Sequence, residues 1–204
     1  MVRKILFPLL VLAGLALAGC GEYGQVEQGR TVAFNKDAGT VTIIKDNGID
    51  EKRPQYTVLP AHTFQLPSDP AERGADPTVG MRLNLDANAN IITMYNPKTQ
   101  QFEKLPFTMI QKEENVSVRR QHPLVYDPAT KKARVFPVVD AAKKTVTIYS
   151  SRQQLYTIIK LSDEDFARYE EKDWGAGDEV RIYYKEAGKA LRFMNVSKTD
   201  ITRR

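Results

Sequence analysis

The feature that most constrains the fold is an internal repeat of short, β-type strings. The string Thr-Val-Thr-Ile occurs at residues 40–43 and again at 145–148, about a hundred residues later. Other strings follow in the same order and at similar spacing. The recurrence of several elements in one order indicates an internal duplication. The remaining pairs are Arg30–Phe34 with Arg134–Phe136, Tyr56-Thr57 with Tyr156-Thr157, Met81–Leu83 with Val180–Ile182, and Met94–Asn96 with Phe193–Asn195.

Each repeat is predicted to consist of short strands separated by turns. In the second copy a helix should begin at Ser162, because Ser162 can cap exposed amides and three acidic residues follow it. Three strands, a helix and two further strands is the order of an OB-like barrel. The strands are expected at Ala133–Val139, Thr145–Ser150, Gln154–Leu161, Glu179–Lys185 and Lys189–Val196.

The first copy departs from this pattern between Pro67 and Pro77. Three prolines in that segment exclude a continuous helix, so a loop or one short turn is expected. The sequence therefore predicts a mainly β protein with two tandem small OB-like or SH3-like β-barrels and one short helix in the second. The first barrel is expected at 30–96, a structured connector at 97–132, and the second barrel at 133–204.

The end of the second repeat resembles small periplasmic barrel domains. The residues that carry this resemblance are Gly177–Tyr184 (GDEVRIYY) and Gly188–Ala190 (GKA). They match hairpin positions rather than chemical groups. The resemblance extends to uncharacterised small bacterial envelope lipoproteins, and it implies a fold but no activity.

The N-terminus has the layout of a secretory signal. Arg3 and Lys4 precede an apolar run that ends at Leu17-Ala18-Gly19-Cys20, and Cys20 is the only cysteine. The run is shorter than the roughly 20 apolar residues of a membrane-spanning helix. The last four residues resemble the lipobox of bacterial lipoproteins. This implies a signal peptide at 1–19, a lipid on Cys20 and a flexible tether at 20–29.

The same resemblance implies an address in the cell envelope. Gly21 stands where an inner-membrane retention signal would have Asp, which favours the outer membrane, facing the periplasm. Cleavage before Cys20 would lower the formal net charge from +5 to +3, too little to indicate a polyanion such as nucleic acid as partner. A lone cysteine allows no internal disulfide, so packed cores must supply the stability.

The sequence indicates no enzyme, cofactor or metal site. His62 and His122 are the only histidines and lack ligand spacing, so both are predicted to be surface or turn residues. Met81 and Met94 fall on the inward faces of strands and are predicted to fill cores rather than bind copper.

One outward face carries basic and aromatic residues together. Strand alternation places Tyr149, Arg181, Tyr183 and Arg192 outside the second barrel. The favoured interpretation is an ordinary solvated β-face whose tyrosines and charged residues have no ligand. The functional hypothesis for this face is a glycan or another envelope protein as partner, because OB barrels hold sugars with such faces. The functional hypothesis is a non-catalytic binding or scaffolding protein, and the alternative is a periplasmic carrier of a small ligand or soft metal.

Overall fold

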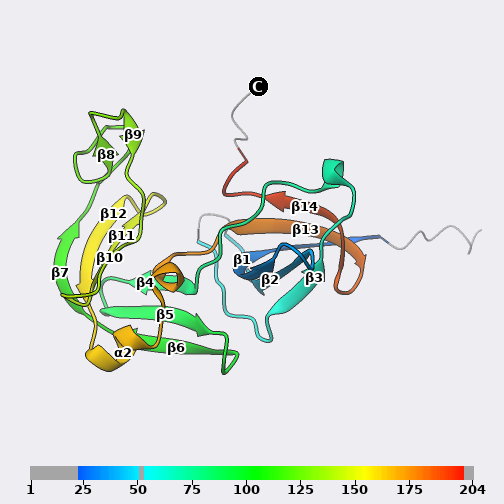
Figure 1. The fold of residues 1–204 in the computed structure, drawn as a ribbon, viewed down its shortest axis with the longest axis horizontal. Coiled ribbons are helices and arrows are strands. Elements are labelled where there is room, and N and C mark those ends of the chain that lie inside the picture. Colours follow the sequence, from blue (N-terminus) through cyan, green and yellow to red (C-terminus); the bar gives the residue numbers. More distant parts are fainter. Residues whose placement is uncertain (1–22, 51–52, 200–204) are drawn as a thin grey trace, which may run out of the picture.

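The computed structural model describes residues 23–50 and 53–199, and it is mainly β. One part of it is a closed five-stranded barrel with strand order β1-β13-β14-β3-β2. Neighbouring strands are antiparallel except β14 and β3, which are parallel. The mainly β fold class and the OB-like barrel are confirmed (Figure 1). The barrel strands are β1 (Gln25–Asn35), β2 (Thr40–Lys45), β3 (His62–Gln65), β13 (Glu179–Glu186) and β14 (Lys189–Asn195).

The barrel combines strands from both repeats. Its first three strands belong to the first repeat, whereas the β13–β14 hairpin belongs to the second. Strand β1 pairs with β13 over six register positions, from Gln25 opposite Tyr184 to Arg30 opposite Glu179. The arrangement therefore differs from the expected tandem barrels with boundaries at 30–96 and 133–204. The β13–β14 hairpin pairs its own two strands locally. Its place in the barrel is set by long-range pairing with β1 and β3.

The remaining strands form a second lobe of two facing sheets. One sheet has the order β4-β5-β6 and the other β10-β11-β12-β7. Their apolar faces share a core that includes Ile92, Met94, Ile148 and Ile159, all at most 1% exposed. The strands are β4 (Arg82–Asp86), β5 (Ile91–Asn96), β6 (Gln101–Pro106), β7 (Thr108–Glu113), β10 (Val138–Asp140), β11 (Thr145–Ser150) and β12 (Leu155–Lys160); β8 (Tyr126–Asp127) and β9 (Lys132–Ala133) form a separate small hairpin.

Two chain segments cross between the lobes, and glycines allow them to approach each other. A Cβ on Gly177 would lie 1.8 Å from the main-chain oxygen of Thr31, and one on Gly80 would lie 2.2 Å from that of Gly175. Hydrogen bonds tie the crossing together: Thr31 N donates to Asp178 O at 2.9 Å, and Asp178 N to Thr78 O at 2.9 Å. Side chains at the glycines would push the backbones apart. The exchange of strands between the repeats, in which the β13–β14 hairpin closes the barrel begun by β1–β3, therefore depends on these glycines.

The local predictions are mostly confirmed, but the strand expected at Ala133–Val139 is wrong: only its ends fall in strands, β9 and β10, and residues 134–137 belong to neither. Helix α2 (Asp163–Ala167) begins after Ser162, whose side chain accepts from Asp165 N. The proline-rich segment holds only the 3-10 turn η1 (Pro70–Glu72), and a second 3-10 turn, η2 (Glu171–Trp174), follows α2. The segment expected to be a connector contributes β6, which pairs with β5, and β7, which pairs with β12.

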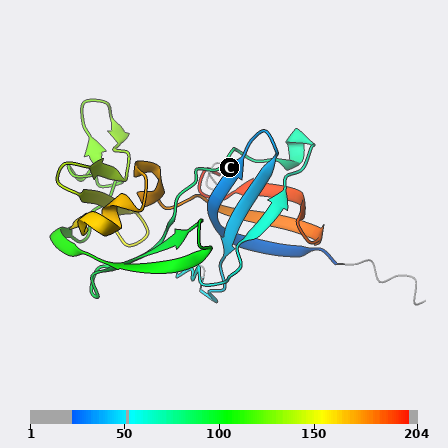
Figure 2. The same cartoon turned by 60° about the horizontal axis from the view of Figure 1, so that its bottom comes forward.

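The expected tether is the main local correction. Cys20 lies outside the described residues, but 25–29 belong to strand β1 and are not a flexible linker. Pairing with β13 supplies the hydrogen-bond partners that the Gly- and Gln-rich composition did not reveal. In the described part of the chain, no helix has the length and apolar character needed to cross a membrane. The described chain starts at the barrel (Figure 2).

Candidate functional site

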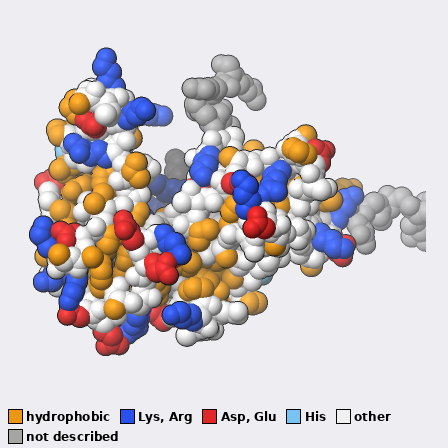
Figure 3. Space-filling view, viewed as in Figure 1, with side chains coloured by type: hydrophobic (Ala, Val, Ile, Leu, Met, Phe, Trp, Pro, Cys, Tyr) orange, Lys and Arg blue, Asp and Glu red, His pale blue; other side chains and the backbone are white. Residues whose placement is uncertain are grey.

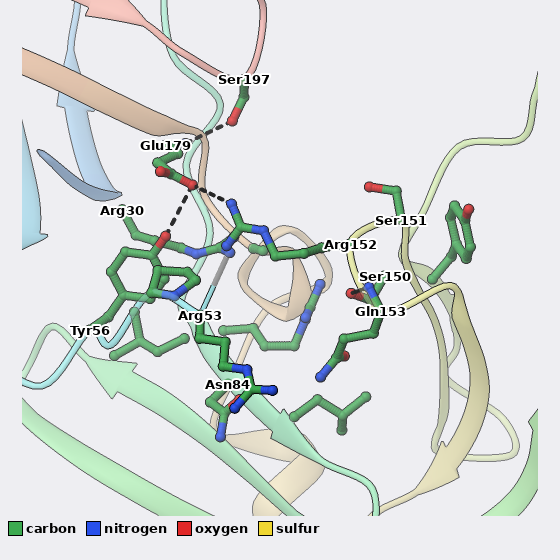
Figure 4. A pocket seen from close by; sticks show the side chains of 16 residues that line it. Arg30, Arg53, Tyr56, Asn84, Ser150, Ser151, Arg152, Gln153, Glu179 and Ser197 are labelled. Atoms are coloured by element: carbon green, nitrogen blue, oxygen red, sulfur yellow. Dashed lines mark hydrogen bonds and ion pairs between the residues drawn. The ribbon is translucent and has the colours of Figure 1, made fainter. Parts of the chain in front are cut away.

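A polar cleft lies between the barrel and the second lobe. Its cavity volume is about 670 Å³. Figure 3 shows the two lobes with a notch between them, and Figure 4 shows the cleft from close by. Both repeats and both lobes contribute to its lining. The lining residues with polar side chains are Arg30, Arg53, Tyr56, Arg82, Asn84, Tyr149, Ser150, Ser151, Arg152, Gln153, Glu179 and Ser197.

Positive charge dominates the lining. Four arginines face a single carboxylate, that of Glu179. Arg30 comes from β1 of the barrel, and Arg82 opens β4 of the second lobe. Arg152 lies in the turn between β11 and β12, and Arg53 lies on the exposed segment before Tyr56. An anion in the cleft would therefore meet guanidinium groups from both lobes.

Arg30 is held in place but remains under-satisfied. Its Nη1 donates to the main-chain oxygen of Gly177 at 3.2 Å, and its guanidinium carbon lies 4.8 Å above the ring of Tyr56. Its Nε is buried and has no hydrogen-bond partner. A buried donor without a partner is costly, so this guanidinium is not fully satisfied by the protein itself.

Arg82 is also without a carboxylate partner among the described residues. Its Nε donates to the main-chain oxygen of Trp174 at 3.2 Å. Burial, together with the like charge of Arg30, lowers the pKa of Arg82 to about 10. The guanidinium still carries its proton at neutral pH. Arg30 and Arg82 therefore form a pair of neighbouring positive charges that no ion pair within the described chain compensates.

Glu179 organises the opposite wall. It lies across from Arg30 in the β1–β13 pairing, but its oxygens are used by other groups. Tyr56 donates its hydroxyl to Oε2 at 3.2 Å, and Arg152 donates Nη2 to the same oxygen at 3.0 Å (Figure 4). Gln28 donates to Oε1. The carboxylate therefore has little capacity left to neutralise Arg30.

The electrostatics of this wall keep its groups in their ordinary charge states. Burial and the negative charge of Glu179 raise the pKa of Tyr56 to about 12, although Arg30 opposes this, so its hydroxyl remains a donor. Burial disfavours the charge of Arg152, but the ion pair with Glu179 outweighs it and raises the pKa of that guanidinium. The Arg152–Glu179 ion pair links the second lobe to the barrel across the cleft.

The rest of the lining combines uncharged hydrogen-bonding side chains with the apolar residues Pro54, Leu83, Leu85 and Ala176. Ser150 ends β11, Ser151 and Gln153 lie in the turn that follows it, Asn84 lies on β4, and Ser197 follows β14. The turn is ordered by a hydrogen bond from Gln153 N to Ser150 Oγ at 3.3 Å, and Gln154 adopts φ = 50°. The cleft can therefore bind an anion and hydrogen-bond a polar group attached to it.

In the described part of the chain, no group of three or more His, Cys, Asp or Glu side chains is placed to hold a metal ion.

The predicted binding face is divided between the lobes. Arg181, Tyr183 and Arg192 lie on the barrel hairpin, where Tyr183 and Arg192 are opposite each other. Arg181 is bonded to Gln28 at 2.8 Å, and Arg192 is ion-paired with Glu72. Tyr149 lies on β11, 5.7 Å from the ring of Phe136, and it lines the cleft instead. The prediction of one face was made for a barrel that contained both β11 and β13, and those strands belong to different lobes.

The histidines and methionines occupy structural positions. His62 lies on β3 and contacts the buried carboxylate of Glu27 at 2.7 Å, while His122 accepts a hydrogen bond from Leu124 N in a turn. Met81 and Met94 are 6% and 0% exposed and belong to the core of the second lobe, as predicted.

Sequence reasoning missed the arginines of the cleft. Arg82 and Arg181 occupy equivalent positions in the two repeats, as do Arg30 and Arg134. Only the first member of each pair lines the cleft. The recurrence of arginine was visible in the sequence and could have marked these positions. The exchange of strands, which brings Arg30 and Arg82 together, was not visible.

Comparisons with known proteins identify one family. The comparison with curated proteins and that with solved structures found no match. A family model described as a domain of unknown function (DUF4881) matches residues 22–204, which include every strand of both lobes. The chain therefore belongs to the DUF4881 family.

Proposed function

We propose that this protein is a lipid-anchored component of the bacterial cell envelope that binds an anionic ligand in the cleft without catalysing its conversion. The observation that carries the binding role is the pair Arg30 and Arg82. Both guanidinium groups line one cavity, and neither forms an ion pair within the described residues. Uncompensated buried charge is costly, and an anion between the two groups would remove that cost.

Three further properties favour binding over catalysis. The lining offers donors and fixed positive charge, which hold an anion in the ground state. Its one carboxylate, Glu179, already accepts from Tyr56, Arg152 and Gln28, so it is poorly placed to act as a general base. The lining contains no cysteine or histidine.

The envelope location rests on the N-terminal sequence. The string Leu17-Ala18-Gly19-Cys20 after a basic and apolar leader supports lipid attachment at Cys20 and an outer-membrane address. A Cys20→Ser chain should not incorporate labelled palmitate and should leave the membrane fraction. Retention of the label or of membrane attachment by this variant would refute the anchor.

The binding role is tested with inorganic phosphate, sulfate and citrate at constant ionic strength. The melting temperature should rise with anion concentration and saturate, because a ligand that binds only the folded state stabilises it by mass action. The Arg82→Met variant should lose this response. Arg192→Met is the matched control, because Arg192 is exposed and paired with Glu72, and it should retain the response. A wild-type response no larger than that to chloride would refute the anion site.

A further inference from the structure

The chemistry of the cleft also indicates which kind of anion it holds. Resting on the binding role proposed above, we infer that the ligand is an organic phosphate whose phosphate group lies between Arg30 and Arg82 and whose body is a hydroxylated, sugar-like group that contacts Asn84 and the 150–153 turn.

The two guanidinium groups favour phosphate over carboxylate. A single arginine fork satisfies both oxygens of a carboxylate. A phosphate monoester has three terminal oxygens and about two negative charges, so two guanidinium groups can bind it together. Arg30 and Arg82 line the same cleft, and the repulsion that Arg30 exerts on Arg82 would be offset by a doubly charged group between them.

The size of the cleft requires a ligand larger than phosphate. Counting each of its oxygens as one water volume, a phosphate ion occupies on the order of 100 Å³. The cavity volume is about 670 Å³, within the range of sites that hold small organic molecules. Most of the cleft is therefore available to the body of the ligand.

The remaining lining matches a hydroxylated body. Apart from the two tyrosines, five residues with neutral hydrogen-bonding side chains line the cleft, and two of these, Ser150 and Ser151, are adjacent at the end of β11. The five are Asn84, Ser150, Ser151, Gln153 and Ser197. Hydroxyl and amide groups both donate and accept, as sugar hydroxyls do. An apolar body would leave these groups unpaired, which is costly.

Two sources could supply this chemistry: a soluble sugar phosphate and the headgroup of a phosphorylated glycolipid. Calorimetry on the purified protein, from residue 20 onward and without lipid, should use glucose 1-phosphate, galactose 1-phosphate and N-acetylglucosamine 1-phosphate. Inorganic phosphate, glucose and glucuronic acid serve as comparisons. Vesicles with and without lipid A form the lipid arm.

The best sugar phosphate, or the lipid A vesicles, should bind at least tenfold tighter than inorganic phosphate and glucuronic acid, and glucose should not bind. Arg82→Met should abolish binding, whereas Asn84→Ala should lose most of the tenfold gain and keep the affinity for inorganic phosphate. Arg192→Met should bind as the wild type does. Urea unfolding of each variant establishes that it is folded.

The alternative results separate the two proposals. If all sugar phosphates and lipid A bind no tighter than inorganic phosphate, the inference about the ligand body is refuted while the anion site stands. Tighter binding of glucuronic acid would refute the choice of phosphate. If no anion binds, both proposals fail. Preference for lipid A vesicles over every soluble sugar phosphate would assign the ligand to a lipid headgroup, and the reverse would assign it to a soluble molecule.

Discussion

Replacing Arg82 by methionine should stabilise the empty protein while removing its anion site. Burial and the neighbouring charge of Arg30 lower the pKa of Arg82 from 12.5 to about 10. Each pKa unit corresponds to about 1.4 kcal/mol, so the folded state carries a cost of about 3 kcal/mol for this charge. The guanidinium is protonated in the folded and unfolded chains below pH 10, so the cost is fully present at neutral pH.

Methionine preserves most of the apolar stem and removes the charge. The substitution leaves the main-chain oxygen of Trp174 without its donor, which costs about 1–2 kcal/mol. The net effect is an increase of about 1–2 kcal/mol in the free energy of unfolding. For a chain of this size that is a rise of about 2–8 °C in melting temperature.

The assay is urea unfolding at pH 7 in a buffer without multivalent anions, followed by far-UV circular dichroism. The midpoint should rise at an unchanged slope, which identifies a change in stability rather than in compactness. Arg192→Met is the control. It removes an exposed ion pair with Glu72 and should shift the free energy of unfolding by less than about 1 kcal/mol. A loss of more than about 2 kcal/mol for Arg82→Met would refute the view that this charge is uncompensated.

Three other predictions concern the framework. Gly177→Ala should cost at least about 3 kcal/mol, because its Cβ would lie 1.8 Å from a main-chain oxygen, whereas Gly175→Ala, with 3.4 Å to its nearest neighbour, should cost less than about 1 kcal/mol by urea unfolding. Burial opposes the charge of Glu27, but hydrogen bonds from neighbouring side chains and nearby positive charges outweigh it and lower its pKa from 4.5. Glu27→Gln should therefore cost about 1–3 kcal/mol at pH 7, and the deficit should shrink as the pH falls below 4; a deficit that stays constant down to pH 3 would contradict this. Fragments 20–129 and 130–204 should each lack a cooperative unfolding transition alone and regain one when mixed, because the closed barrel takes strands from both; cooperative unfolding of either fragment by itself would show that the exchange is dispensable.

Local patterns in the sequence predicted local structure well. Ser162 followed by acidic residues predicted the start of α2, and the prolines near Pro70 predicted a loop or one short turn in place of a helix. Alternation predicted that Val180 and Ile182 point inward, and both are fully buried. These features depend on capping, dihedral restriction and side-chain periodicity, all of which act within a few residues.

The candidate site was largely beyond sequence reasoning. The basic and aromatic residues singled out on the outward strand faces were read as one surface, but Tyr149 lies in a different lobe from Arg181. The sequence identified Glu179 only as a strand residue. In the structure it is 8% exposed and accepts hydrogen bonds from Tyr56 and Arg152. Partners on different strands, 27 residues apart for Arg152 and Glu179 and 123 for Tyr56 and Glu179, leave no periodic signal in a single chain.

The sequence by itself determined most of the strands and their turns, because each depends on residues that are neighbours along the chain. The internal duplication and the lipid anchor stay predictions. Only the tertiary structure showed that β13 and β14 close the barrel begun by the first repeat, whereas the first repeat's own hairpin, β4–β5, lies in the second lobe. A hairpin can pair with either of two similar sets of strands, and the choice depends on long-range packing and on the glycine crossing at Gly80 and Gly177. That choice brings Arg30 and Arg82 into one cleft.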